Sequence, residues 1–202
     1  IATALILWAR DRIQSVVDQR FFSEKYQLDK TLQQLNQASG YLTDPFALAR
    51  ITLTTCRDVM DASTATMFVR ESTGVLRLIG ADQLSNAPAS LSAEILSGTD
   101  EDQHVLRRLS SVNYDEASPL QKLLDDLSAD LVCFLRSDQG IDGLIFLGPR
   151  TNEVAYSAED IAFLQAISQM TVLALHSSRA NQSLARLDSE LQVKVDRIAE
   201  QQ

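Results

Sequence analysis

The chain contains little of the chemistry that enzymes and metal proteins use. Its 202 residues include only two cysteines and two histidines. Cys56 and Cys133 have no CxxC spacing and lie in apolar runs, so we expect buried, reduced thiols of a reducing compartment. No glycine-rich phosphate loop, nucleophile elbow or HExxH helix occurs in the sequence. Nothing in the pattern therefore indicates a catalytic centre, and we predict that the protein is not an enzyme.

Basic residues are fewer than acidic residues, and the net charge is therefore −9. Phosphate binding needs clustered lysine and arginine, so nucleic acid is excluded as the main partner. Acidic residues concentrate between residues 100 and 130, where we expect solvated loops, with a docking surface or cation site as the alternative. His104 follows three of these acids, but one flexible stretch would supply a poor set of metal ligands, so we predict no metal.

The apolar stretch at the start of the chain, IATALILWA at residues 1–9, is shorter than the roughly 20 residues that span a bilayer. It fits the last turns of a membrane helix, with Trp8 at the interface and Arg10 and Arg12 on the cytoplasmic side. The alternative is an amphipathic helix inside a dimer.

Proline and glycine are absent after Pro149, and residues 156–202 predict one long helix. Ser157 and Asp160 form a capping box at its start. Apolar residues then recur densely up to Leu175, which is typical of a helix packed on a domain. A sparser seam follows, typical of a two-stranded coiled coil. The seam residues are Leu184, Leu187, Leu191 and Ile198. A helix of about 45 residues reaches roughly 65–70 Å, so its far end needs a partner helix, and we expect a second copy of the chain.

Residues 1–42 also predict helices with a narrow apolar stripe, which suits helix pairing better than burial in a large core. We predict that Leu28, Leu32 and Leu35 form part of the dimer interface. Gly40, followed by Asp44 and Pro45, ends this region.

Between the two flanks, the periodicity predicts an α+β domain. The first helix begins at Asp44, with Pro45 at its first position, and continues to Met60. Strands are predicted at residues 63–70, 75–79, 131–136 and 143–147, and short helices at 91–96 and 119–127. Short connections favour an antiparallel sheet with its first and last helices on one face. The predicted divisions are N-terminal signalling helices at 1–42, the domain at 43–178, and a connector at 179–202.

This pattern resembles the GAF domain, a sensory module of bacterial signalling proteins. The resemblance covers about residues 44–178. Four segments carry it: the helix Asp44–Met60, STATMFVR at 63–70, LVCFLRSDQGIDGLIFLGPR at 131–150, and YSAEDIAFLQAISQMTVLALHSSR at 156–179. The preceding segment, from Arg10 to Leu32, looks like the linker that joins membrane helices to a GAF domain in membrane-anchored sensors.

The resemblance implies the cytoplasmic part of a bacterial inner-membrane signalling protein, such as a sensor histidine kinase or a related regulator. It implies a parallel homodimer that passes a signal, by rearrangement of its helices, to an output domain after residue 202. The tail KVDRIAEQQ looks like the start of the connector to that domain. The alternatives are a ligand-free dimerisation spacer and a thiol-based redox enzyme.

The resemblance also implies a ligand pocket between the sheet and the irregular connection at residues 80–127. The predicted lining residues are Phe68, Arg70, Arg77, Tyr114 and Phe146, with ordinary core or surface positions as the alternative for each. No particular cofactor follows. The motif of cyclic-nucleotide-binding members is absent, and neither Cys133-Phe134 nor Cys56-Arg57 matches the cysteine to which bilin-binding members attach their pigment.

Overall fold

The computed structural model describes residues 44–82, 87–100, 103–109 and 117–200. The predictions for residues 1–42, including Leu28, Leu32, Leu35 and the membrane exit at 1–9, lie outside these ranges, as does Tyr114. Within the described part of the chain, none of the helices combines the length and apolar character needed to cross a membrane.

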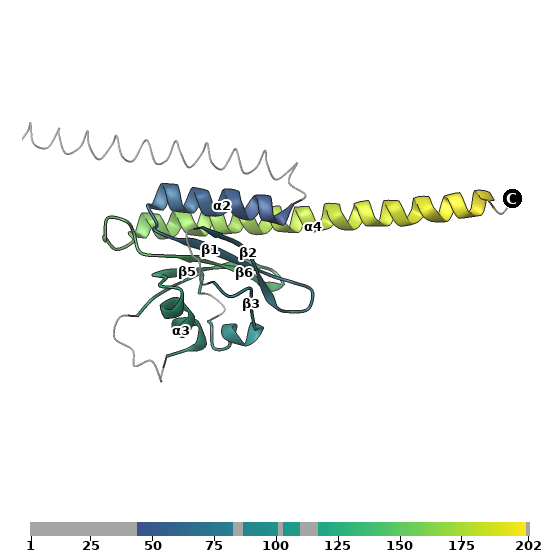
Figure 1. Ribbon diagram of the computed structural model, residues 1–202. Coiled ribbons are helices and arrows are strands. Elements are labelled where there is room, and N and C mark those ends of the chain that lie inside the picture. The colour runs from purple at the N-terminus through teal and green to yellow at the C-terminus, as the bar shows by residue number, and fades with distance from the viewer. Residues whose placement is uncertain (1–43, 83–86, 101–102, 110–116, 201–202) are drawn as a thin grey trace, which may run out of the picture.

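Six strands form one antiparallel sheet in the order β3-β2-β1-β6-β5-β4. The strands are β1 (Ala65–Arg70), β2 (Leu76–Asp82), β3 (Ser90–Leu91), β4 (Val105–Arg107), β5 (Leu131–Ser137) and β6 (Gly140–Leu147). The helices are α2 (Pro45–Met60), α3 (Pro119–Asp126), α4 (Ala158–Glu200) and the 3-10 turn η1 (Ala93–Leu96). Helices α2 and α4 cover one face of the sheet, whereas α3 and η1 lie on the other (Figure 1). The predicted α+β fold is therefore confirmed.

Local capping chemistry fixes where the two long helices begin. The Asp44 side chain accepts a hydrogen bond from the backbone N–H of Phe46 at 3.0 Å, and Pro45 occupies the first turn of α2. At α4 the predicted capping box is present. The Asp160 N–H donates to Ser157 Oγ at 3.1 Å, and the Ser157 N–H donates to Asp160 Oδ2 at 2.8 Å.

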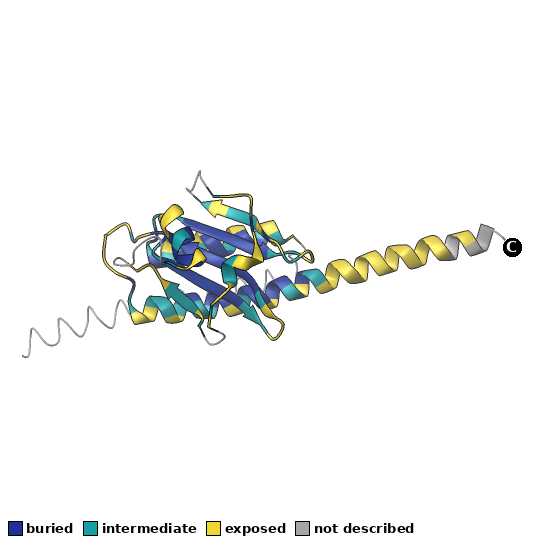
Figure 2. Ribbon diagram, turned by 90° about the horizontal axis from the view of Figure 1, so that it is seen from below, coloured by how far each residue is buried: buried dark blue, intermediate teal, exposed yellow. Residues whose placement is uncertain are grey.

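Helix α4 is continuous over 43 residues. The sequence predicts a long helix here but leaves open whether it is unbroken near Ser177 and Ser178. At 1.5 Å per residue it is about 65 Å long. Its first half packs on the sheet and α2, and the rest projects from the domain (Figure 1). Residues 181–194 of this projecting part are all exposed (Figure 2). We call the part from residue 181 onwards the rod.

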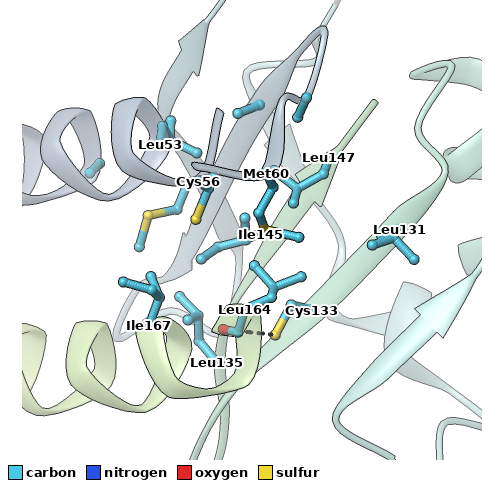
Figure 3. Close-up of a cluster of buried hydrophobic side chains, with 14 of the residues drawn as sticks. Leu53, Cys56, Met60, Leu131, Cys133, Leu135, Ile145, Leu147, Leu164 and Ile167 are labelled. Atoms are coloured by element: carbon cyan, nitrogen blue, oxygen red, sulfur yellow. Dashed lines mark hydrogen bonds between the residues drawn. The ribbon is translucent and has the colours of Figure 1, made fainter. Parts of the chain in front are cut away.

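Each face of the sheet has its own apolar cluster. The first lies between the sheet and helices α2 and α4, and includes Cys56, Cys133, Ile145 and Leu164 (Figure 3). The second lies between the sheet and α3, and includes Phe68, Leu124 and Phe146. Strand alternation supplies both, because successive side chains of β1 and β6 point to opposite faces.

A β-bulge at Asp142 interrupts the pairing of β5 with β6. Leu135 pairs with Gly143 and Arg136 pairs with Ile141, so Asp142 has no Cα partner on β5. A bulge turns its extra residue away from the normal alternation. Here it places the Asp142 side chain within hydrogen-bond distance of α4. Strand β6 begins at Gly140, three residues earlier than the strand predicted at residues 143–147.

Candidate functional site

The residues predicted to line a ligand pocket separate into two groups. Phe68 and Phe146 belong to the second apolar cluster, where their rings meet edge to face with centroids 5.8 Å apart. Both side chains are almost completely buried by this packing. They therefore act as core residues in the described structure, and a contact with a ligand stays a prediction.

Arg70 and Arg77 lie instead along a groove at the place where α4 leaves the domain. This neck groove has a volume of about 1020 Å³ and lies between the start of α2, the β1–β2 and β5–β6 hairpin ends, and residues 175–186 of α4. Its apolar lining includes Phe46, Val69 and Leu175. The groove is open to solvent and combines apolar surface with a few charged groups, so it is a candidate surface for a small molecule.

A polar cluster beside the groove ties the sheet to α4. Asp142 Oδ2 lies 2.8 Å from His176 Nε2, and Asp142 Oδ1 lies 3.4 Å from Arg179 Nη1. Arg179 Nη2 also donates to the backbone carbonyl oxygen of Arg70 at 2.6 Å. We call Asp142, His176 and Arg179 the neck latch, since they join β6 and β1 to the last turns of α4 that touch the domain.

The neck latch favours the ionised form of Asp142. Burial alone would raise the pKa of this carboxyl group. Hydrogen bonds from Ser137 and His176, together with the positive charges of His176 and Arg179, outweigh burial and lower the pKa below its ordinary value. Asp142 is therefore ionised at neutral pH and forms an ion pair with Arg179.

Arg70 differs from the other groove arginines in its partners. Arg77 Nε lies 2.7 Å from Glu71 Oε1, and Arg186 Nε lies 3.1 Å from Glu190 Oε1. The Arg70 side chain forms no ion pair with any described residue, and its Nε is buried without an acceptor. A buried N–H group without an acceptor costs about 1–3 kcal/mol. The Nε atom itself is covered, so an external acceptor would contact the part of the Arg70 guanidinium that lines the groove.

Both cysteines lie in the first apolar cluster (Figure 3). Burial raises the pKa of Cys133 to about 11, and burial together with the nearby Cys133 raises the pKa of Cys56 further above its usual range. The Cys133 thiol contacts the carbonyl oxygen of Leu164 at 4.0 Å. Redox enzymes need an exposed thiolate, and neither residue supplies one in this structure.

Across the described ranges, histidine, cysteine and acidic side chains form no group of three that could hold a metal ion. His176 lies where α4 leaves the domain and is a member of the neck latch.

The predicted C-terminal seam lies on the rod. Leu184, Leu187 and Leu191 have exposed fractions of 63%, 55% and 61%. Nothing within the described chain covers them. Ile198 lies further along the same helix, and its side chain is outside the described residues.

Sequence reasoning missed the neck latch. One available signal was Asp142, a carboxylate beside Gly143 at the start of an apolar strand. The other was the pair His176 and Arg179, which are three residues apart and so share one side of a helix.

Comparison with known proteins identifies the fold. No family model and no curated protein matches the sequence. Among solved structures, a methyl-accepting chemotaxis protein (residues 122 to 287) matches with a TM-score of 0.58 and 12% identity, over 72% of this chain and 97% of that one. The GAF domain of Thermosynechococcus elongatus PixJ, in its blue-light absorbing form, matches with a TM-score of 0.53 and 13% identity, over 73% and 95% of the two chains.

A third similar structure is the GAF domain of a phosphoenolpyruvate-protein phosphotransferase from Coxiella burnetii. Its TM-score is 0.56 at 14% identity, over 77% of this chain and 96% of that one. Together with the sheet order and the placement of α2 and α4, these similarities show that the chain has the GAF fold.

Proposed function

We propose that this chain is a sensory or relay module of a bacterial signal-transduction protein. The observation that carries the proposal is that one unbroken helix, α4, both covers the sheet and forms the rod. A rotation or shift of α4 on the sheet would move the far end of the rod, since a continuous helix transmits such a displacement. The GAF fold, which the similar structures share, supports the proposal.

The finer elements of the proposal are a cytoplasmic location, an inner-membrane anchor before residue 44, and an output domain beyond the rod, such as a kinase or a transcriptional activator. They rest on the resemblance of residues 10–32 and 194–202 to the linkers of membrane-anchored sensors.

We propose further that the chain works as a parallel homodimer whose two copies of α4 pair along one seam. Two heptad series on α4 support this. Leu173, Ala180 and Leu187 recur every seven residues, as do Ser177, Leu184 and Leu191. In the domain, the opposite side of α4 is buried against the sheet by residues such as Leu164, Ile167, Thr171 and Leu175. The outward side there includes Leu173, with an exposed fraction of 70%. The seam of the rod therefore continues onto the domain.

Disulfide cross-linking tests the paired seam. Leu187→Cys and Leu173→Cys place thiols on the seam, whereas Ser189→Cys places one on the far side of the rod. The native cysteines are buried, so they contribute little background. We expect mild oxidation to give covalent dimers for both seam variants and few for Ser189→Cys. Equal cross-linking of all three variants, or none at all, would contradict parallel pairing along α4.

The second candidate function is a ligand-free dimerisation spacer. Its support is the dense packing of Phe68 and Phe146, which fill space where the resemblance places a pocket. Native mass spectrometry separates the two functions: a dimer with added mass supports a ligand-binding sensor, and a clean dimer supports a spacer or a relay without a ligand.

A further inference from the structure

The neck groove is positively charged although the chain is acidic. Among the described residues, four arginines and two carboxylates line it. The arginines are Arg70, Arg77, Arg179 and Arg186, and the carboxylates are Glu71 and Asp142. In a chain with a net charge of −9, this concentration of arginine is a local exception. It favours an anionic ligand.

Existing ion pairs limit the charge that such a ligand carries. Glu71 pairs with Arg77, Asp142 pairs with Arg179, and Glu190 pairs with Arg186. Arg70 alone of the four forms no ion pair within the described ranges, and its Nε has no acceptor there. One uncompensated guanidinium matches one negative charge, and its planar N–H groups suit a carboxylate.

The remaining surface of the groove specifies the rest of the ligand. Val69, Ile79 and Leu175 line it and also belong to the first apolar cluster or pack against it. Phe46, at the start of α2, adds an aromatic ring that is 58% exposed. Val69 and Leu175 are already buried, so the surface on which an aliphatic chain can be buried comes mainly from Phe46 and Ile79.

From these observations we infer that the neck groove binds a small organic monocarboxylate with an aliphatic body, anchored by Arg70. The site lies on the side of α2 and α4. It is therefore distinct from the pocket that the GAF resemblance implies, which lies between the sheet and residues 80–127.

The location gives binding a physical effect on α4. Arg179, which lines the groove, donates to the Arg70 carbonyl oxygen and contacts Asp142, so a ligand at Arg70 adjoins the neck latch. Binding would bias how α4 sits on the sheet, and this last step rests on the proposed relay function.

The experiment is a titration of the full chain with hexanoate. Binding is monitored in ¹H–¹⁵N correlation spectra of the arginine Nε–H groups. Arg70→Met assigns the Arg70 resonance and removes the proposed anchor. Arg108→Met is the control, because Arg108 lies outside the groove and its side chain is paired with Asp130 at 2.8 Å. Hexanamide, which has the same chain length without the charge, and inorganic phosphate are the control ligands.

We expect hexanoate to shift the Arg70 Nε–H resonance in a saturable way at about millimolar concentration. Arg70→Met should weaken hexanoate binding by at least about tenfold, and Arg70→Lys less, because Lys keeps the charge but loses the planar pair of donors. Arg108→Met should change it less than about twofold, because Arg108 does not line the groove. An unchanged Arg70 resonance in the natural protein would overturn the inference, even where a variant fails to fold. Equal binding of hexanamide or phosphate would overturn it as well.

Cross-linking of Leu187→Cys, repeated with hexanoate, separates this inference from the proposed function. Binding at Arg70 with unchanged cross-linking would support the site and contradict its part in the relay. Cross-linking on the seam with no hexanoate binding would overturn the site and leave the paired rod supported.

Discussion

The two halves of α4 have the same backbone geometry but different surroundings. From Ala158 to about residue 180, the helix buries a broad apolar face that includes Leu164, Ile167 and Leu175. From residue 181 onwards, it presents a narrow line of leucines to solvent. The first half of the helix packs on the sheet of its own chain. We propose that the second half packs on a second copy of the chain.

The comparison also separates two kinds of stability. The domain half is stabilised within the chain by side chains from α2 and the sheet, and this does not depend on concentration. The rod lacks such contacts in the described structure, and an isolated helix of this length is marginal in water. Its order should therefore depend on self-association, which makes it the half of α4 that is easier to change.

The largest expected effect comes from Leu164→Ala in the domain half. Leu164 is fully buried, and removing its side chain leaves a cavity in the first apolar cluster. The free energy of unfolding should fall by about 2–5 kcal/mol. Urea denaturation followed by circular dichroism measures the loss. A change below about 0.5 kcal/mol would show that α4 does not pack as described.

Leu187→Asn combined with Leu191→Asn tests the rod half of the same comparison. Both positions are exposed in the single chain, so the free energy of unfolding of the domain should not change. The dimer should be lost, because two polar residues would occupy neighbouring seam positions. Native mass spectrometry reports the subunit number and circular dichroism reports the helix content. An unchanged dimer with unchanged helicity would count against the coiled coil.

Gly143→Ala tests how closely β6 approaches β1 beside the bulge at Asp142. A Cβ atom at this position would collide with the backbone carbonyl oxygen of Phe68 and crowd Leu135 Cδ1. Overpacking of this kind costs about 1–3 kcal/mol. Thermal unfolding measures it, with the exposed turn substitution Thr73→Ala as the control. Equal melting temperatures for the two variants would contradict the close approach of β6 to β1.

Asp142→Asn tests the neck latch and has a defined pH dependence. The pKa of Asp142 is lowered in the folded state, so its stabilising contribution is complete above the unfolded pKa of about 4. It is lost as the pH falls through the lower, folded-state pKa. At pH 7 the variant should lose about 1 kcal/mol, because His176 and Arg179 are partly exposed and the contact is screened.

The difference between natural and Asp142→Asn chains should therefore shrink as the pH falls below 4. Stability curves collected from pH 7 to pH 2.5 check this. A stability difference that is constant over that pH range would mean that the ionised Asp142 carboxylate does not stabilise the packing of α4 on the sheet.

The smallest effect is expected for Arg186→Ala on the rod. Arg186 and Glu190 form an exposed pair at a spacing of four residues, with the arginine first, which is the weaker orientation. The loss should not exceed about 0.2–0.5 kcal/mol, and it should vanish in high salt. Helix content measured at two salt concentrations checks this, and a larger loss would indicate that Arg186 has a further partner.

Elements whose signals are local could be predicted from the sequence. Asp44 with Pro45, and Ser157 with Asp160, mark the starts of α2 and α4, because a cap acts within one helical turn. The apolar run from Leu131 predicted β5 to within one residue of its observed end. Strand β4 is not among the predicted strands, since its three residues form a strand only by pairing with β5.

The neck groove and the neck latch could not be predicted, because they depend on contacts across the chain. Arg70 and Arg179 are 109 residues apart and meet only after β1 and α4 pack together. Asp142 reaches His176 because a bulge shifts one residue of β6, and a bulge is not visible in the periodicity of a strand. The different positions of Phe68 and Arg70 could not be predicted from the sequence either. They are two residues apart on β1, but one lies in the core and the other at the rim of the groove.

The unbroken path of α4 has a consequence for insertions and deletions. Each residue added to a helix turns everything beyond it by about 100° and moves it by 1.5 Å. Inserting seven residues into the rod would nearly restore the original direction of the seam, whereas inserting two or five would turn the seam to the far side of the helix. If the rod passes a signal to a further segment as proposed, that segment should tolerate changes of linker length in steps of seven, and lose its coupling to the domain when two or five residues are inserted.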